Sequence, residues 1–292
     1  MYVAFAPSRL DGLASAAILM RHARLRQKDI RLHILQNGLE PVRQSVLFLL
    51  DIVPESEESV RELAKNNKIA YWCYHQKTKF DDVVKEVSAM SDVLDRPSQC
   101  SAELVQERFM PQDSVSVSLS KIARDAELFK NVDDRSQLLS DVIASGMDPK
   151  QLVSLFSQGV FWTKELERTR QDYIRKREEA LQEMEKHKLD KNYVDQNVAF
   201  YVCRNLLQSA DAGEHALEHS GADFVVLLYR NGSVIFRRSK HNRTSMAKLA
   251  EVLGGGGNAF AAGAQLNKPV TNENKHELIS FVDNSVKNFF LS

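Results

Sequence analysis

The feature that most constrains the fold is an alternation of strand-like and helix-like segments along residues 1–75. Short apolar runs typical of buried strands occupy 2–6, 30–35, 46–53 and 68–75, and segments with helical spacing occupy 12–26 and 56–67. Strands joined through helices favour a parallel, doubly wound sheet, whose ligand crevice lies beyond the carboxyl ends of the strands. We therefore predict an α/β fold and look for chemistry in "PSRLDG" after the first strand, at Asp51, and in "CYHQ".

The remainder of the 292 residues predicts a second, smaller α/β domain behind a helical region. Helical spacing is clearest at 101–109 and 115–129, and a long charged helical stretch runs from 149 to 189. Acids and bases alternate along that stretch, which favours an interdomain helix over one that binds a membrane or nucleic acid. A strand at 198–203 and a hairpin with an Asn-Gly turn at 223–239 then begin a new sheet. The predicted domains are 1–130, a helical linker at 131–191, and 192–292.

Composition excludes several classes of protein. Thirty-nine basic residues balance thirty-nine acidic ones, so a binding site for an anionic partner must be a local patch. The three cysteines, Cys73, Cys100 and Cys203, lack metal-type spacing and are expected to be reduced and packed. The first residues lack a basic signal-peptide region, and no apolar run approaches the roughly 18 residues of a membrane span. We expect a cytoplasmic protein that does not contact a membrane.

A run of four glycines lies in the most basic part of the chain. Gly254, Gly255, Gly256 and Gly257 follow a short helical segment and precede "NAFAAGAQL". Glycines at such a place let backbone N–H groups approach an anion closely, and a following helix would add its positive end, whereas the alternative is a flexible connector. Between Phe224 and Ala250 there is no acidic residue, whereas six basic residues occur, namely Arg230, Arg237, Arg238, Lys240, Arg243 and Lys248. Glycines beside such a basic segment predict a site for phosphate groups of a nucleic-acid backbone.

These segments resemble the DHH phosphoesterase family in order and spacing. "FRRS" followed by "SMAKLAEVLGGGGNAFAAGA" is similar to the DHH-associated domain, where an arginine-serine strand end precedes a GGGGH…AAG motif that holds nucleic-acid phosphates. "SRLDGLASAAIL" resembles the family's HxDxDG segment, "LLDIVP" its second aspartate motif, and "YHQ" stands where DHH belongs. "CSAELV", "IARDAEL" and "NLLQSADAGEHAL" resemble archaeal RecJ-like members. The resemblance implies a DHH-type sheet domain joined by a helical linker to a DHH-associated domain.

The resemblance also implies that the catalytic site is degenerate. Family members use aspartates and histidines to hold two manganese ions, which activate water for phosphodiester hydrolysis. This chain departs from the ligand pattern at four positions, Pro7, Arg9, Tyr74 and Gln76. Four residues remain as candidate ligands: Asp11, Asp51, His75 and, by a looser correspondence, Asp125. In the phosphate-binding motif Asn258 replaces the histidine. The expected phosphate contacts are Arg237, Arg238, Lys240, Arg243, the four glycines and Asn258.

Arg9 is the substitution with the clearest physical consequence. A guanidinium cannot act as a ligand, and it places a fixed positive charge where two dications would sit. We expect Arg9 to form an ion pair with Asp11 or Asp51, although a free arginine that binds a phosphate is an alternative. The sequence therefore predicts no bound metal, no other cofactor and no catalytic residue.

Three functions remain open at this point. The first is a non-catalytic protein that binds single-stranded nucleic acid, DNA rather than RNA, or acts as a scaffold in replication or repair. By resemblance to the inactive archaeal RecJ homologues, its partners would be GINS and the MCM helicase. The second is an active exonuclease or oligonucleotide phosphodiesterase with a reduced site for Mn²⁺ or Mg²⁺. The third is a protein that binds a small nucleotide as a regulatory ligand.

Overall fold

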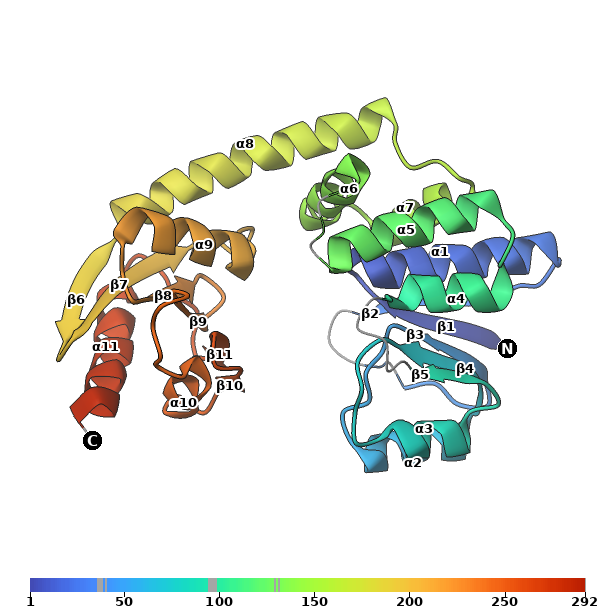
Figure 1. The fold of residues 1–292 in the computed structure, drawn as a ribbon, viewed down its shortest axis with the longest axis horizontal. Helices are drawn as coiled ribbons and strands as arrows, with labels where there is room; N and C mark the ends of the chain where they lie inside the picture. The colour runs from blue at the N-terminus through green and yellow to red at the C-terminus, as the bar shows by residue number, and fades with distance from the viewer. Residues whose placement is uncertain (36–38, 40, 94–98, 129, 131, 292) are drawn as a thin grey trace. The chain divides into compact units, whose positions relative to one another are not determined.

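The chain forms two compact units, Met1–Tyr173 and Ile174–Ser292. They are seen in a computed structural model that describes residues 1–35, 39, 41–93, 99–128, 130 and 132–291 (Figure 1). Each unit has its own sheet and its own apolar cores. No helix of the described residues is long and apolar enough to cross a membrane.

The first unit contains the predicted parallel sheet. Its strands run in the order β2-β1-β3-β4-β5, and every neighbouring pair is parallel. The four strands predicted from the apolar runs are present, and the three-residue β5 is too short to have produced a pattern. The bounds are β1 (Tyr2–Pro7), β2 (Arg31–Leu35), β3 (Val46–Leu50), β4 (Lys68–Tyr74) and β5 (Ser91–Val93).

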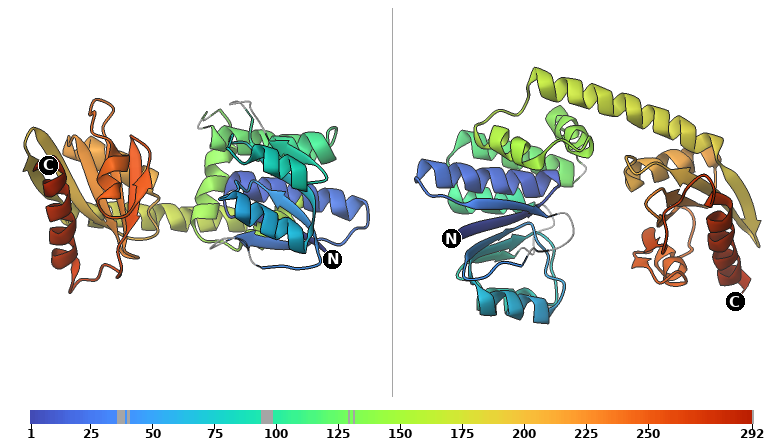
Figure 2. Two further views of the ribbon diagram at one scale, coloured as in Figure 1. Left: turned by 90° about the horizontal axis from the view of Figure 1, so that it is seen from below. Right: turned by 180° about the vertical axis from the view of Figure 1, so that it is seen from behind.

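Helices cover both faces of this sheet, as a doubly wound fold requires (Figures 1 and 2). Alternation along β1 sends Ala4 and Ala6 into one core and Val3 and Phe5 into the other. The first face carries α1 (Leu10–Leu25), α4 (Ser101–Phe109), α5 (Ser114–Glu127), α6 (Asp134–Ala144) and α7 (Pro149–Ser157). The second face carries α2 (Glu57–Asn66) and α3 (Asp81–Val87).

The division between the units lies further along the chain than the predicted boundary at residue 130. Residues 134–166 do not form a separate linker, because α6, α7 and the start of α8 (Lys164–Lys186) contribute to the first core. Leu139, Phe156 and Leu166 are fully buried there. The end of α8 belongs to the second unit, where Ala180 and Met184 are buried. The charge pattern indicated a solvated helix, but it could not reveal these few apolar contacts.

The second unit is a mixed sheet with helices on both faces. The described strands run in the order β10-β11-β9-β8-β7-β6, with β7 and β8 parallel and the other neighbours antiparallel. The predicted hairpin is confirmed as β8 and β9, with Gly232 at a φ of 88° in the turn. The strands are β6 (Leu189–Tyr193), β7 (Gln196–Cys203), β8 (Phe224–Tyr229), β9 (Ser233–Arg238), β10 (Gly256–Gly257) and β11 (Ala261–Gln265). The helices are α9 (Ser209–Ser220), α10 (Met246–Glu251) and α11 (Lys275–Leu291).

The segment after the glycine run forms the strand β11, so no helix directly follows the glycines to add its positive end. Gly256 and Gly257 pair with Gly263 and Ala262, and β11 pairs along its length with β9. A Cβ on Gly255 would lie 2.1 Å from the carbonyl oxygen of Gly263, so the small residues permit a very close approach of the two segments. Pairing with β9 therefore overrides the helical preference of the alanines.

Candidate functional site

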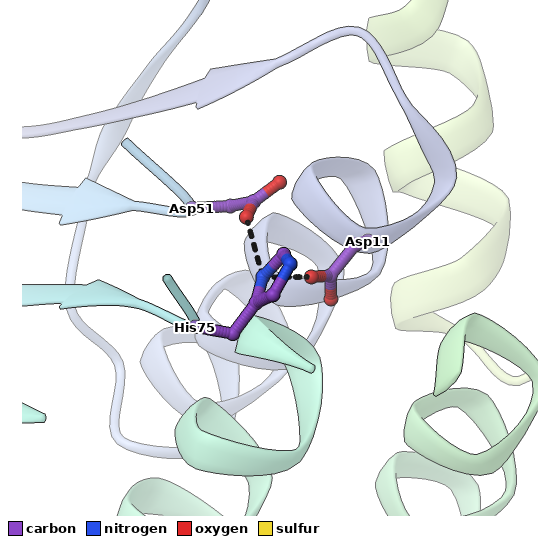
Figure 3. A group of neighbouring side chains, drawn as sticks. All are labelled: Asp11, Asp51 and His75. Carbon is purple, nitrogen blue, oxygen red and sulfur yellow. Dashed lines mark ion pairs between the residues drawn. The ribbon is translucent and has the colours of Figure 1, made fainter. Parts of the chain in front are cut away.

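The three stretches singled out in the first unit meet at one edge of the sheet. Arg9 and Asp11 follow β1, Asp51 follows β3, and His75 follows β4. The strand order reverses direction between β1 and β3, and this is where doubly wound sheets form their ligand crevice. Figure 3 shows the His75 ring between the carboxylates of Asp11 and Asp51.

His75 is surrounded by acidic groups. Its Nδ1 atom lies 3.4 Å from Asp11 Oδ2 and 3.5 Å from Asp51 Oδ1, and its Nε2 atom lies 3.2 Å from Glu127 Oε1. The side chains of Asp11 and Asp51 are completely buried. Hydrogen bonds to Asp11, Asp51 and Glu127 raise the pKa of His75 to about 11. The ring is therefore an imidazolium at neutral pH and forms a cationic centre between the carboxylates.

Arg9 supplies the second positive charge of the cluster. Its Nε atom donates to Asp51 Oδ2 at 2.6 Å and its Nη2 atom donates to Asp51 Oδ1 at 2.8 Å, which is a bidentate ion pair. Arg9 therefore pairs with Asp51, one of the two partners expected from the sequence. Burial acts to raise the pKa of Asp51, but hydrogen bonds from His75 and Arg9 outweigh it and hold the pKa below its ordinary value.

Asp51 also has an unusual backbone conformation. Its φ is 58°, in the left-handed region that aspartate tolerates better than most residues. Besides Arg9, the hydroxyl of Ser101 donates to Asp51 Oδ1 at 2.7 Å. Side-chain contacts to Arg9 and Ser101 thus hold a strained residue in place, a situation common at functional sites.

Asp11 caps a helix that begins ninety residues later in the chain. Its two carboxylate oxygens accept from the backbone N–H groups of Ser101 and Ala102, at 2.8 and 2.7 Å, at the start of α4. These are donors that a helix leaves unsatisfied, and the negative charge also suits the positive end of the helix. The close packing of α1 on β1 that positions Asp11 requires Gly12, because a Cβ there would lie 2.5 Å from the carbonyl oxygen of Pro7.

The ligand atoms of Asp11, Asp51 and His75 lie within 4.8 Å of one another, a spacing at which side chains can hold a metal ion. Their hydrogen bonds argue against it. Both oxygens of Asp51 receive the Arg9 fork, both oxygens of Asp11 receive backbone N–H groups, and the Arg9 guanidinium places a fixed positive charge beside the carboxylates. The residues present therefore do not fit a two-manganese centre.

Four predicted positions take no part in the hydrogen bonds and ion pairs of this cluster, as far as the described residues show. Tyr74 is buried on the opposite face of the sheet, where its hydroxyl donates to Asp81 Oδ1 at 2.8 Å, so it does not stand in for a lost ligand. Gln76 is exposed, and Pro7 is the last residue of β1. Asp125 accepts from the Ser136 hydroxyl at 2.6 Å and from the Val132 N–H at 3.0 Å, and it thereby stabilises the start of α6.

Two members of the cluster were missed from the sequence. Ser101 and Glu127 lie in helices that were predicted, at the first residue of α4 and the last residue of α5. Both lie in stretches that resemble archaeal RecJ-like members, "CSAELV" and "IARDAEL", but the stretches alone assign them no role, because their proximity to His75 and Asp51 arises from how α4 and α5 pack on the sheet. Glu127 and Asp125 are two residues apart in α5, so assigning the wrong one reverses the direction of the side chain on the helix.

In the second unit, the strand β9 separates two of the predicted phosphate contacts. Arg237 points toward α9, where its Nη1 atom donates to the Ser209 carbonyl at 3.2 Å and its side chain covers Gly213. Arg238 points to the opposite face, and its guanidinium lies over the ring of Phe260 at 4.3 Å from the ring centre. Adjacent residues of a strand alternate, so Arg237 and Arg238 cannot both face the glycine run.

The other predicted contacts are accessible. Lys240 and Arg243 are exposed in the segment between β9 and α10, and neither forms an ion pair with a described residue. Gly254, Gly256 and Gly257 are exposed, whereas Gly255 is half-buried. The side-chain oxygen of Asn258 accepts from the Phe260 and Ala261 N–H groups at 2.8 and 2.9 Å, so this oxygen holds a turn.

Comparisons with known proteins relate the chain to solved structures alone. No family model and no curated protein matches it. The structure of RecJ from Thermus thermophilus with Mn²⁺ superposes with a TM-score of 0.66 at 13% identity, covering 99% of this chain and 52% of that one. An exonuclease RecJ bound to manganese gives 0.61 at 14% identity, covering 99% and 90%. PggH, a pGpG-specific phosphodiesterase from Vibrio cholerae, gives 0.53 at 11% identity, covering 98% and 99%. The chain thus spans about half the length of the Thermus protein, and at these identities the likeness shows the fold.

Proposed function

We propose that this chain, which has the fold of RecJ, is a catalytically inactive protein that binds single-stranded nucleic acid, DNA in preference to RNA. The observation that carries the first part is the bidentate Arg9–Asp51 ion pair in the crevice of a fold whose RecJ examples were solved with manganese. Together with the His75 imidazolium, Arg9 provides from the protein itself the positive charge that would otherwise come from metal ions.

The binding part of the proposal rests on the second unit. Lys240 and Arg243 are exposed in the segment that follows β9, and the glycine run begins eleven residues after Arg243. No acidic residue occurs between Phe224 and Ala250. Exposed cations without acidic neighbours in sequence are suited to a phosphate backbone, with little dependence on base sequence. A scaffold role with GINS and the MCM helicase as partners is a further part of this proposal, and it rests on the resemblance to inactive archaeal RecJ homologues.

Incubation with labelled single-stranded DNA in Mn²⁺ tests the inactive site, with RecJ from Thermus as the positive control. We expect no cleavage above background and no stoichiometric manganese in the purified protein. The reason is that the Arg9 guanidinium already binds the Asp51 carboxylate, and backbone N–H groups of α4 already bind the Asp11 carboxylate. Metal-dependent cleavage that is lost in Asp51→Asn would overturn the proposal. Arg9→Asp combined with Pro7→His should restore metal binding more readily than turnover, since the groups that orient ligands are also needed.

Salt dependence of binding tests the second unit. Anisotropy of a fluorescent oligothymidine should show binding that weakens steeply with salt, with a slope reduced by about 1.4 in Lys240→Gln/Arg243→Gln, since each contact with a single strand contributes roughly 0.7. The matched control is Lys65→Gln/Lys68→Gln, two exposed lysines of the first unit, which should leave the slope unchanged. Equal slopes in all three proteins would contradict this location of the site.

The second candidate function is an active phosphodiesterase with a single metal ion. It is favoured by the spacing of Asp11, Asp51 and His75, whose ligand atoms lie within 4.8 Å of one another. This function requires Arg9 to leave Asp51 and His75 to lose its proton. The same Mn²⁺ assay distinguishes the two candidates, since cleavage is expected for the second and not for the first.

A further inference from the structure

The turn that follows the glycine run is held rigidly by its own backbone. The N–H of Asn258 donates to the Ala261 carbonyl at 2.9 Å, and the Asn258 side chain accepts from Phe260 and Ala261. The carbonyl of Phe260 accepts from the Arg238 N–H at 3.1 Å, and the carbonyl of Ala259 accepts from the Met246 N–H at 3.3 Å. The turn is therefore fixed to the end of β9 and to the start of α10.

This rigid turn presents an exposed aromatic ring. Phe260 is 59% exposed, whereas the core aromatics of the same unit, such as Phe224 and Phe236, are fully buried. The guanidinium of Arg238 lies over the ring at 4.3 Å from its centre. A cation at that distance orients the ring and leaves most of the side chain accessible.

The surroundings of Phe260 match one class of ligand. The exposed cations Lys240 and Arg243 lie in the segment that leads from Arg238 to α10, to which the turn is hydrogen-bonded. An aromatic ring beneath a guanidinium, on a turn hydrogen-bonded to both ends of a segment with exposed cations, combines the two elements with which proteins bind single strands. Cations attract the backbone and the ring stacks on a base. An apolar protein partner would gain nothing from these charges.

We propose that Phe260 is a stacking platform for a nucleobase, with Arg238 fixing the ring and Lys240 and Arg243 neutralising the adjoining phosphates. The inference rests on the proposed function, and it adds that bases as well as phosphates are contacted. Stacking is indifferent to sequence, because every base has an aromatic face. The fixed turn lowers the ordering cost of binding.

Phe260→Leu tests the platform, since it keeps the apolar character and removes the ring. We expect binding of a single-stranded oligonucleotide to weaken roughly 5- to 150-fold, the range for loss of one base stack. The salt slope should stay unchanged, because no phosphate contact is removed. Phe260→Trp should bind at least as tightly as the unaltered protein, with quenching of the added indole.

Two controls separate stacking from other effects. Phe281→Leu changes a phenylalanine of α11 that is 53% exposed, and it should leave the affinity unchanged. An oligonucleotide of abasic sites keeps the phosphates without the bases, and the difference between Phe260→Leu and the unaltered protein should disappear with it.

The outcomes distinguish this inference from the proposed function. Salt-dependent binding by the unaltered protein with equal affinity in Phe260→Leu overturns the platform and leaves the phosphate site standing. A weakening by Phe260→Leu that persists with the abasic strand also overturns it, because the effect then does not require a base. Absence of binding by the unaltered protein overturns both.

Discussion

At the scale of single residues, the central result is how Arg9 changes the chemistry of the crevice. Three acidic side chains, Asp11, Asp51 and Glu127, surround His75, and Arg9 clamps one of them. Buried carboxylates require nearby positive charge, since their desolvation is otherwise too costly. Arg9 and the His75 imidazolium meet that requirement without a metal ion.

Arg9→Ala should therefore destabilise the first unit. Breaking a buried ion pair costs roughly 3 to 5 kcal/mol, but the Arg9 side chain is 42% exposed, so we expect about 2 kcal/mol. Arg9→Lys should recover less than half of this loss, because an ammonium cannot form the bidentate contact. The measurement is urea denaturation followed by tryptophan fluorescence.

A double-mutant cycle identifies the partner of Arg9. Asp51→Asn removes the charge that Arg9 neutralises, so Arg9→Ala should cost much less in that background. The same cycle with Asp125→Asn should show no coupling, since the carboxylate of Asp125, in α5, accepts from the Ser136 hydroxyl of α6 and not from Arg9. An Arg9→Ala protein with unchanged stability but weaker binding of nucleic acid would mean that Arg9 faces a ligand instead.

At the scale of elements, one side chain joins the start of α1 to the start of α4. Asp11 satisfies two N–H groups that α4 leaves open, and it is only 1% exposed, so water cannot replace it. The first turn of α4 also supplies Ser101, which contacts Asp51. The residues that form the crevice are thus also the residues that hold the start of α4 in place.

Asp11→Ala should loosen α4 as a unit. Two buried N–H groups would lose their acceptor, which costs about 3 kcal/mol, and Asp11→Asn should cost less because it keeps one oxygen. Hydrogen exchange at Ser101 and Ala102 should accelerate in Asp11→Ala. In the control Asp125→Ala, exchange should accelerate at Val132 and Asp133 instead, whose N–H groups donate to Asp125. Acceleration at Ser101 in both variants would contradict a specific cap.

At the scale of the whole molecule, the two units have separate cores. The first is built around Leu13, Ile18 and Phe156, and the second around Phe200 and Phe236. Both tryptophans of the chain, Trp72 and Trp162, belong to the first unit. Tryptophan fluorescence therefore reports on that unit alone.

Unfolding of the molecule should accordingly depend on the probe. We expect the fluorescence transition and the far-ultraviolet circular dichroism transition not to coincide, since two-state behaviour fails for chains with independent cores. Arg9→Ala should shift the fluorescence midpoint. Leu227→Ala, which removes a fully buried side chain of the second unit, should shift only the part of the dichroism transition that fluorescence does not report. Coincident transitions that move together in both variants would contradict independent units.

What the sequence determined by itself is local. Apolar runs and helical spacing identified β1 to β4, α1 and the Asn-Gly hairpin, because burial patterns repeat with the period of each element. The rule that parallel strands present their carboxyl ends to one crevice was enough to bring Arg9, Asp51 and His75 together.

Tertiary structure alone decided the contacts between distant elements. How the helices pack on the sheet decides that Asp11 caps α4 and that Arg9 pairs with Asp51. It also decides that Glu127, and not Asp125, contacts His75. Tyr74 points to the opposite face of the sheet for the same reason. The alanine-rich β11 is a strand because it pairs with β9. Arg237 points toward α9, away from Arg238, because successive residues of a strand point to opposite faces. The periodicity of the sequence indicates which face of a helix or strand is buried. Which side chains of other elements contact that face depends on how the elements pack together.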